Sequence, residues 1–270
     1  MTTSLHFWKM SGAGNDFVVV DARAGLPAPA GELAAQLCRR RVGIGADGLL
    51  AVQGVSERRV VVDYRNADGS AADFCGNGAR CVARFAYVRE IAGSPMVLAF
   101  PGQEVRATVE GARVRIETPR PRILGRVELV AADGSRFEAV QVDAGVAHLV
   151  VHAADGPAPP LATLRAALAR ARPDLLDRVN LTTVERRGAD ALHVRTLERG
   201  SGETLACGSG ALAATALEPR AAAGVRRVVI PPAGIPLVVR LAPDPGPASL
   251  EGDAVIVFHG VCDDVGEPAP

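Results

Sequence analysis

The sequence predicts an α+β protein built from two similar halves, and three observations support this fold class. Short segments in which apolar and polar residues alternate, as in half-buried antiparallel strands, occur throughout the chain. Segments with apolar residues at helical spacing are fewer, with about two in each half. A short segment containing cysteine and glycine occurs twice, about half the chain length apart. Two related domains around a pseudo-twofold axis would explain all three observations.

The clearest strand signal is a hairpin. Val105, Ala107 and Val109 alternate with polar residues, and the alternation resumes over residues 113–117 after a turn at Gly111. The same pattern predicts further strands, many of them bounded by glycine or proline, at Arg59–Tyr64, Ala191–Glu198, Arg227–Ile230, Leu237–Leu241 and Ala254–Phe258.

Leucines at helical spacing predict helices. One helix is expected over Gly31–Arg40, where Leu33 and Leu37 lie one turn apart. Another contains Leu161, Leu164 and Leu168 and ends before Pro173. The proline-rich segments at residues 156–160 and 243–247 are typical of surface connections rather than of an interdomain linker.

The two halves are expected to be domains. We predict an N-terminal half over residues 1–122, which carries Cys75, and a C-terminal half over residues 123–258, which carries Cys207. Residues 259–270 are expected to return to the first half.

Composition limits the classes of partner. Thirty basic residues balance thirty acidic residues, so the chain lacks the positive charge typical of proteins that bind nucleic acid or anionic membranes. No stretch approaches the roughly 20 apolar residues of a membrane-spanning helix, and the first residues lack the pattern of a secretion signal. We therefore expect a cytoplasmic protein with a small-molecule partner; a homodimer is compatible with the sequence. The five cysteines are widely spread, which indicates reduced thiols.

The repeated segment suggests a chemistry. Residues 74–80 read FCGNGAR and residues 206–212 read ACGSGAL, and each segment leads into a helical run. Glycines on both sides of Asn77 and of Ser209 allow backbone N–H groups to approach a ligand, and the helix that follows contributes its positive end. Each segment is therefore a candidate cradle for a carboxylate. The same helix dipole lowers the pKa of a thiol at the helix start.

Two such thiols on opposite sides of one carbon can invert it. A thiolate removes the α-proton from one face, and a thiol delivers a proton to the other face. Helix-terminal amides directed at the α-carboxylate would stabilise the carbanion formed in between. The residues therefore favour a two-base epimerase or racemase, with Cys75 and Cys207 as the two bases.

Other interpretations remain open from the residues alone. Either cysteine could be a small buried hydrophobic residue, as we expect for Cys38, Cys81 and Cys262. A metal site is disfavoured, because there is no second close cysteine pair or histidine ligand motif. A thiol hydrolase would pair Cys207 with His148, which the sequence cannot place beside a sulfur. A binding module would leave the duplicated thiols unexplained, and it would have no turnover to lose when one thiol is alkylated.

At these residues the sequence resembles diaminopimelate epimerase, over nearly the whole chain and in the same order. The resemblance begins with FWKMSGAGNDF at residues 7–17 and GIGADG at residues 43–48. The most specific matches are YRNADGS at residues 64–70 with the FCGNGAR segment, and ERGSGET at residues 198–204 with the CGSG of the second segment.

The resemblance implies two similar α+β domains, each with a mixed sheet curled around a central helix, and an active site in the cleft between them. It implies catalysis without pyridoxal phosphate, another cofactor or a metal. Cys75 and Cys207 would be the catalytic bases. The reacting carboxylate would bind Gly76, Asn77, Gly208 and Ser209. The rest of the substrate would contact Asn15, Asn66, Asn180, Glu198 and Arg199. From spacing alone, Arg199 could equally be a solvated residue paired with Glu198 or Glu203.

The chain departs from the family pattern at one place. Where the family usually has Gly-Asn-Pro-His, this sequence has Gly145, Val146, Ala147 and His148. An amide expected near the unreacted end of the substrate is therefore replaced by an isopropyl group, and His148 is expected to support the cleft rather than to act on substrate. The resemblance implies interconversion of LL- and meso-diaminopimelate in lysine and peptidoglycan precursor biosynthesis. Val146 leaves open a racemase or epimerase of the same fold that acts on another amino acid.

Overall fold

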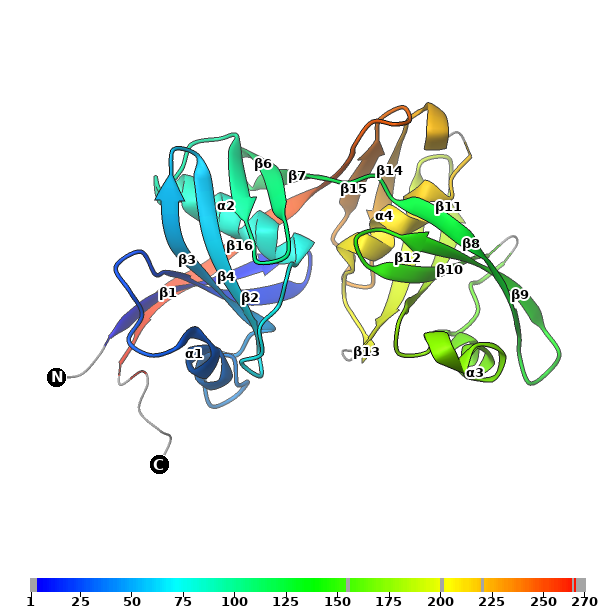
Figure 1. The fold of residues 1–270 in the computed structure, drawn as a ribbon, viewed down its shortest axis with the longest axis horizontal. Helices are drawn as coiled ribbons and strands as arrows, with labels where there is room; N and C mark the ends of the chain where they lie inside the picture. Colours follow the sequence, from blue (N-terminus) through cyan, green and yellow to red (C-terminus); the bar gives the residue numbers. More distant parts are fainter. Residues whose placement is uncertain (1–3, 154–155, 200–201, 220, 264, 266–270) are drawn as a thin grey trace. The chain divides into compact units, whose positions relative to one another are not determined.

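The structure is a computed structural model, which describes residues 4–153, 156–199, 202–219, 221–263 and 265. The chain forms two compact units (Figure 1). The first unit comprises Met1–Glu117 and Glu251–Pro270, and the second comprises Thr118–Leu250. The last strand, β16 (Ala248–Cys262), therefore begins in the second unit and ends in the first.

The first unit is built on strands that pair with their neighbours in chain order. These are β1 (Leu5–Gly12), β2 (Asn15–Asp21), β3 (Gly48–Ser56), β4 (Arg59–Asn66), β5 (Met96–Ala99), β6 (Glu104–Glu110) and β7 (Arg113–Thr118). Strand β16 is adjacent to both β7 and β1, so the sheet closes on itself. The pairs β2–β3 and β4–β5 are parallel, and each is connected by a helix, as parallel neighbours require.

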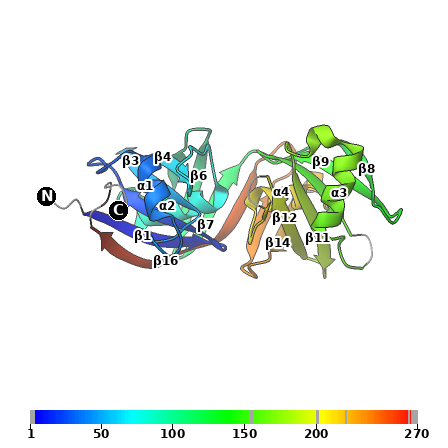
Figure 2. The ribbon, with the colours of Figure 1, turned by 90° about the horizontal axis from the view of Figure 1, so that it is seen from below.

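The two helices of the first unit lie on opposite faces of its sheet. Helix α2 (Gly76–Val88) packs against β1, β2, β3, β5 and β6, which makes it the central helix of the closed sheet (Figure 2). Helix α1 (Ala30–Leu37) packs against β3 and β4. Leu49 and Ala51 of β3 belong to the hydrophobic cluster that contains α1, whereas Leu50 lies beside Gly78 of α2. Because side chains alternate along a strand, the first part of β3, residues 48–52, is buried on both faces.

The second unit repeats this arrangement. Its strands are β8 (Arg122–Val130), β9 (Arg136–Asp143), β10 (Ala147–His152), β11 (Asn180–Arg187), β12 (Ala191–Glu198), β14 (Val225–Ile230) and β15 (Leu237–Leu241), in that order across the sheet, with the short β13 (Gly202–Glu203) paired to β12. The parallel pairs are β10–β11 and β12–β14. Helix α3 (Leu161–Ala171) packs against β8 and β11, and α4 (Gly208–Ala216) packs against β10, β11, β12, β14 and β15. Short 3₁₀ turns lie at Pro173–Leu175 and Ala221–Ala223.

The order of elements confirms the predicted fold class. In each unit, a strand pair leads through one helix into a second strand pair, which leads through a second helix into the next strands. The repeat β1-β2-α1-β3-β4-α2-β5-β6 corresponds to β9-β10-α3-β11-β12-α4-β14-β15. The chain is thus two similar α+β units, each with a mixed sheet around one central helix.

The predicted strands are present, but one predicted helix is too long. Helix α1 ends at Leu37, three residues before the expected end at Arg40. The chain then turns back, because the N–H of Gly43 donates to the carbonyl of Arg39 and the N–H of Gly45 donates to that of Leu37. Arg41 adopts a positive φ of 77°, which a helix cannot accommodate.

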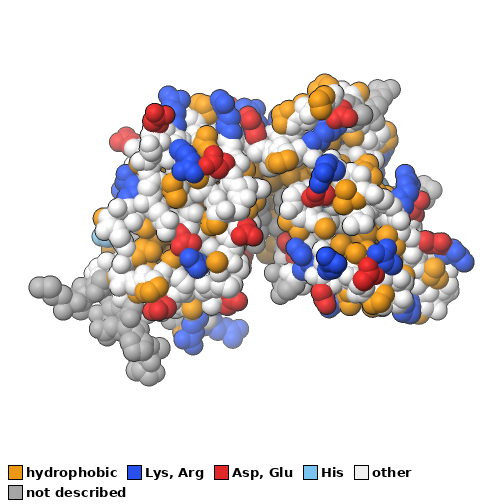
Figure 3. All heavy atoms as spheres, in the orientation of Figure 1, with side chains coloured by type: hydrophobic (Ala, Val, Ile, Leu, Met, Phe, Trp, Pro, Cys, Tyr) orange, Lys and Arg blue, Asp and Glu red, His pale blue; other side chains and the backbone are white. Residues whose placement is uncertain are grey.

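The surface agrees with the balanced composition. Figure 3 shows acidic and basic side chains interspersed over the visible face of each unit, without a continuous basic patch on that face. None of the described helices combines the length and the apolar character needed to cross a membrane.

Candidate active site

The first candidate half-site is the start of helix α2. Cys75 is the N-cap residue of this helix, with an extended backbone, and its Sγ accepts a hydrogen bond from the N–H of Gly78 at 3.5 Å. Gly76 is half-buried and Asn77 is buried at the first positions of the helix. The sulfur therefore lies at the positive end of the helix dipole, beside amides that have no partner within the helix.

Asn77 belongs to a chain of hydrogen bonds with a charge at each end. Arg80 Nη2 donates to Asn77 Oδ1 at 2.8 Å, Asn77 Nδ2 donates to Asn15 Oδ1, and Asn15 Nδ2 donates to Asp47 Oδ2 at 3.0 Å. The guanidinium at one end and the carboxylate at the other fix the direction of both amides. The structure thus brings together Asn15 and Asn77, which are far apart in the sequence.

Close packing holds α2 against this chain. Gly12 on β1 lies so near the start of the helix that a Cβ at this position would lie 2.7 Å from the carbonyl oxygen of Asn77. Only glycine allows this approach of the two backbones.

Asn66 has a different environment. It is the last residue of β4, and its Nδ2 donates to Ser70 Oγ at 3.0 Å across the turn that precedes Cys75. The N–H of Asn66 donates to the carbonyl of Ser70, and its own carbonyl accepts from Gly69. In the described residues, Asn66 therefore orders this turn and does not join the Asn15–Asn77 chain.

The second candidate half-site repeats the first at the start of helix α4. Cys207 is the N-cap residue, and its Sγ accepts from the N–H of Gly210 at 3.4 Å. The Sγ also lies 3.3 Å from Ser209 Oγ. Burial raises the pKa of the Cys207 thiol to about 12, so the lowering expected from the helix dipole does not prevail at this cysteine. The carboxylate of Glu198 also raises this pKa, and the hydrogen bonds from Ser209 and Gly210 oppose both effects.

A buried histidine supports Ser209. His148 Nε2 lies 2.9 Å from Ser209 Oγ, and Nδ1 lies 2.9 Å from Thr182 Oγ1, which is 3.2 Å from Thr196 Oγ1. Burial lowers the pKa of His148 to about 4, with a smaller contribution from the positive charge of Arg199. An uncharged imidazole fits a hydrogen-bonding support in a buried chain of hydroxyl groups.

Asn180, Glu198 and Arg199 lie together at the ends of β11 and β12. The buried Asn180 accepts the backbone N–H of Arg199 on Oδ1 at 3.0 Å, and Glu198 Oε1 accepts from Thr204 Oγ1 at 2.5 Å. Glu203 is paired with Arg195 at 2.7 Å. Arg199 is exposed and forms no ion pair within the described part of the chain.

The remaining cysteines fit structural roles. Burial raises the pKa of both Cys38 and Cys81 to about 12, so both thiols stay protonated near neutral pH. No disulfide joins any of the five cysteines. Among the described residues, no group of three or more His, Cys, Asp or Glu side chains is arranged to hold a metal ion.

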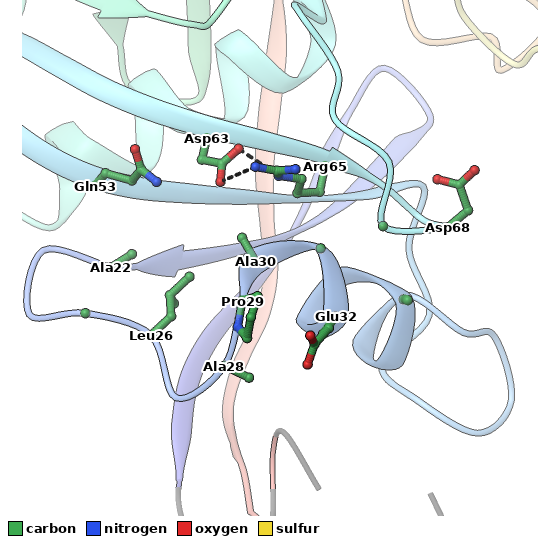
Figure 4. A pocket seen from close by; sticks show the side chains of 14 residues that line it. Ala22, Leu26, Ala28, Pro29, Ala30, Glu32, Gln53, Asp63, Arg65 and Asp68 are labelled. Atoms are coloured by element: carbon green, nitrogen blue, oxygen red, sulfur yellow. Dashed lines mark hydrogen bonds and ion pairs between the residues drawn. The ribbon is translucent and has the colours of Figure 1, made fainter. Parts of the chain in front are cut away.

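A separate cavity of about 760 Å³ lies beside α1 (Figure 4). Its polar lining includes Asp63 and Arg65, which pair with each other at 2.9 Å, as well as Glu32 and Asp68. None of the candidate site residues lines this cavity. We assign it no part in the reaction.

The structure also adds residues to the site that the sequence patterns did not indicate. Arg80 and Asp47 orient the Asn15–Asn77 chain, and Thr182 and Thr196 extend the support of His148. Arg80 and Asp47 belong to the recognised motifs, but a motif does not show which polar side chains turn inward. The two threonines lie on strands, where the β propensity of threonine explains their presence without any function.

Comparison with known proteins defines the family. The family model described as Diaminopimelate epimerase matches residues 7–124 and 140–257. The chain belongs to the diaminopimelate epimerase family. A diaminopimelate epimerase of Xanthomonas axonopodis pv. citri (strain 306) is 37% identical over 95% of this chain and 95% of its own length. The family motifs named above all lie within the matched residues.

Another similar protein is named for a different activity. An O-ureido-serine racemase of Streptomyces lavendulae is 36% identical and covers 96% of this chain and 95% of its own length. Among solved structures, a phenazine biosynthesis protein of the PhzF family from Bacillus anthracis superposes with a TM-score of 0.69 at 12% identity, over 96% of this chain and 99% of that chain. That likeness shows a shared fold.

Proposed function

We propose that this protein is a cofactor-independent, two-base epimerase that interconverts LL- and meso-diaminopimelate in the formation of lysine and peptidoglycan precursors. One observation carries the proposal: each unit presents a cysteine as the N-cap of its central helix, followed by glycine and a polar residue. Membership of the diaminopimelate epimerase family supports the substrate. Since the substrate is an intermediate of amino-acid biosynthesis, we infer a cytoplasmic location, which cell fractionation can test.

The chemistry requires both half-sites at one substrate carbon. One cysteine, as thiolate, removes the α-proton, and the other, as thiol, donates a proton to the opposite face. As the proton leaves, negative charge spreads into the α-carboxylate. We infer that the amides at the starts of α2 and α4, together with Asn77 and Ser209, hold that carboxylate and stabilise the added charge; the N-cap position of each cysteine supports this.

The unreacted end of the substrate needs its own partners. Arg199 is suited to this role, because it is exposed, is unpaired within the described residues and can bind a carboxylate through two parallel hydrogen bonds. Asn15, Asn66, Asn180 and Glu198 supply acceptors and donors for the distal ammonium and carboxylate groups. Asn180 already holds the backbone N–H of Arg199, which fixes the strand end from which this side chain extends.

A second candidate substrate follows from Val146. The first parallel pair of β2 with β3 is Phe17 with Gly48, and the first parallel pair of β10 with β11 is His148 with Asn180. Phe17 and His148 are therefore equivalent. Val146 lies two residues before His148, as Asn15 lies two residues before Phe17, so these two positions correspond. The first unit has an amide there and the second unit has an isopropyl group. Together with the O-ureido-serine racemase among the relatives, this favours, as the alternative, racemisation of an amino acid without a distal amino-acid group.

A substrate screen by chiral chromatography tests both candidates. Purified protein is incubated in D₂O with LL-diaminopimelate, O-ureido-serine and common amino acids. We expect inversion of diaminopimelate, with solvent deuterium at the inverted carbon, because the departing and arriving protons use different thiols. Cys75→Ala and Cys207→Ala should each abolish inversion. Full turnover by either variant, or turnover that depends on added pyridoxal phosphate, would contradict the two-base proposal.

Two further variants separate the substrates. Arg199→Ala should lower kcat/KM for diaminopimelate, because it leaves a substrate carboxylate unpaired. The loss should correspond to about 2–5 kcal/mol of transition-state stabilisation. Val146→Asn should leave kcat/KM for diaminopimelate unchanged or higher, since it restores an amide. If the substrate has an apolar side chain, Val146→Asn should instead impair its turnover. Unchanged kcat/KM for diaminopimelate in Arg199→Ala would refute the assignment of the distal group.

A further inference from the structure

Arg80 is a fully buried cation beside Cys75. Its exposed fraction is 0%. The side chain folds back towards the start of α2, as long side chains in helices do, so that Nη1 lies 3.4 Å from the carbonyl of Gly76 and Nη2 lies 2.8 Å from Asn77 Oδ1. The guanidinium is thus bonded to the two residues that directly follow Cys75.

The charge of Arg80 has no carboxylate partner in the described chain. Arg80 forms no ion pair there, and its Nε has no hydrogen-bond partner. Burial lowers the pKa of Arg80, whereas Cys81, Cys75 and Asp253 act in the opposite direction. A guanidinium nevertheless stays charged in proteins, and a buried charge without a counter-charge is strongly unfavourable. The position therefore calls for a nearby anion.

The other ionisable groups around Arg80 do not supply that anion well. Burial raises the pKa of Cys81 to about 12, so its thiol is neutral. The side chain of Asp253 is 50% exposed and lies 3.8 Å from Arg113, where solvent screens it. Arg84, one turn further along α2, is itself a cation and donates to the carbonyl of Ala254. Cys75 is the remaining group.

The second unit has the opposite electrostatics at the corresponding positions. Arg80 follows Cys75 by five positions, and the residue five positions after Cys207 is Leu212, which is apolar and buried. Asn66 ends β4, nine positions before Cys75, and Glu198 ends β12, nine positions before Cys207. The Cys75 half-site thus pairs a cation with a neutral amide, whereas the Cys207 half-site pairs an apolar residue with a carboxylate.

We propose that Arg80 is a positioning residue that makes Cys75 the thiolate and Cys207 the thiol before substrate binds. Two electrostatically identical half-sites would tend to hold both protons, and a dithiol cannot begin the reaction. Glu198 reinforces the difference by favouring the protonated form of Cys207. This inference rests on the proposed function for its catalytic meaning, although the protonation of each thiol can be measured without any substrate.

The proton balance gives Arg80 a second effect. When Cys75 removes the α-proton, the carbon receives the proton of Cys207, so one inversion leaves Cys75 protonated and Cys207 as thiolate. A proton must then leave Cys75 for solvent, and another must return from solvent to Cys207. The buried cation beside Cys75 and the carboxylate beside Cys207 both favour this return to the starting state.

The test follows alkylation of each cysteine by iodoacetamide as a function of pH, without substrate, using mass spectrometry of the two active-site peptides. Only the thiolate reacts, so the midpoint of each rate profile reports the protonation of that cysteine. In the wild-type protein, the midpoint for Cys75 should be below that for Cys207. In Arg80→Met, the rate at Cys75 near pH 7 should fall about tenfold, which corresponds to a midpoint one pH unit higher.

Matched variants separate charge from structure. Arg80→Lys retains the cation and should recover most of the wild-type midpoint. Arg84→Met removes a cation from the same helix, one turn further from Cys75. It should leave the midpoint of the Cys75 alkylation profile unchanged. Circular dichroism and thermal unfolding establish that each variant is folded. If Arg80→Met does not fold, Arg80→Gln, which is also uncharged but keeps a hydrogen-bond donor, takes its place.

A midpoint for Cys207 at or below that for Cys75 in the wild-type protein would overturn the inference, as would an unshifted Cys75 midpoint in folded Arg80→Met. An Arg84→Met variant with a shift equal to that of Arg80→Met would also overturn it, because the effect would then belong to the helix as a whole. Failure of the proposed function can be distinguished from failure of this inference. If the protein inverts no amino acid but shows the expected midpoints for both cysteines, only the proposed function is contradicted.

Discussion

In the second half-site, the buried His148 contacts Ser209 and is uncharged near neutral pH. Burial lowers the pKa of His148 from its ordinary value of 6.5 to about 4. Between these two pH values the unfolded chain binds a proton that the folded chain does not, so protons favour unfolding. The stabilisation is complete above pH 6.5 and is lost as the pH falls towards 4. His152, whose pKa burial also lowers, acts in the same direction.

We therefore predict that the free energy of unfolding falls by about 2 kcal/mol or more between pH 7 and pH 5, measured by urea denaturation. Carboxylates with lowered pKa values contribute little in this window, because they become protonated only at lower pH. His148→Gln should reduce the dependence on pH, since the titrating group is removed. The wild-type protein is the comparison, and a His148→Gln variant whose free energy of unfolding depends on pH as steeply as that of the wild type would contradict the assignment.

Single residues also show where sequence interpretation stops. The Cys-Gly-x-Gly repeat predicted two thiols at helix starts, and both cysteines are N-cap residues. The inward direction of Arg80 was not predictable in this way, because an arginine in a helix is usually solvated and only packing decides otherwise. The same holds for the link from Asn15 to Asn77, which depends on the contact of β2 with α2.

At the scale of elements, the two central helices differ in how closely their glycines are packed. A Cβ on Gly210 of α4 would lie 2.5 Å from Thr196 Oγ1, whereas a Cβ on Gly78 of α2 would lie 3.3 Å from a terminal methyl group of Leu50. The first contact requires a core side chain to move, and the second needs only a small adjustment of a flexible one.

Gly210→Ala should therefore destabilise the protein, by about 1–3 kcal/mol for overpacking, partly offset by about 1 kcal/mol of helix propensity. It should also displace Thr196 from Thr182 and so loosen the support of His148. Gly78→Ala, the equivalent change in the other unit, should be close to neutral because the same gain in propensity balances a milder contact. Calorimetric Tm values of the two variants test this; a lower Tm for Gly78→Ala than for Gly210→Ala would contradict the packing argument.

Some strands could be predicted from the sequence and others could not, depending on whether one face of the strand is solvated. Strands with one solvated face, such as β6, β7 and β12, show the alternation from which they were predicted. Strands β2 and β3 do not, because helices cover both of their faces and their residues are apolar in succession, as in Val18, Val19 and Val20. Helix α1 ended early because its last turn is set by backbone hydrogen bonds from Gly43 and Gly45, which apolar periodicity does not report.

At the scale of the whole molecule, the duplication of one α+β unit provides two similar half-sites, and the substitutions between them provide their difference. The repeated order of strands and helices places Cys75 and Cys207 at equivalent helix starts. The sequence repeat predicted this duplication. Within the repeat, Asn15 corresponds to Val146 and Arg80 to Leu212, and these are the differences from which we propose separate chemical roles for the two halves.

Because the duplication provides two equivalent thiols, we expect the protein to be sensitive to oxidation. If both cysteines exchange protons with one carbon, as proposed, their sulfurs come within several ångströms of one another when no substrate separates them. Thiols at that distance form a disulfide once one of them is a thiolate, because the thiolate attacks the oxidised partner.

Mild oxidation should therefore abolish activity, and dithiothreitol should restore it. Peptide mass spectrometry should find Cys75 linked to Cys207, while the buried Cys38 and Cys81 stay reduced. Cys207→Ala is the control, since it removes the bridge and should leave Cys75 without its partner. Reversible inactivation in which no Cys75–Cys207 link is found would show that the two sulfurs do not meet, and it would count against a single carbon between them.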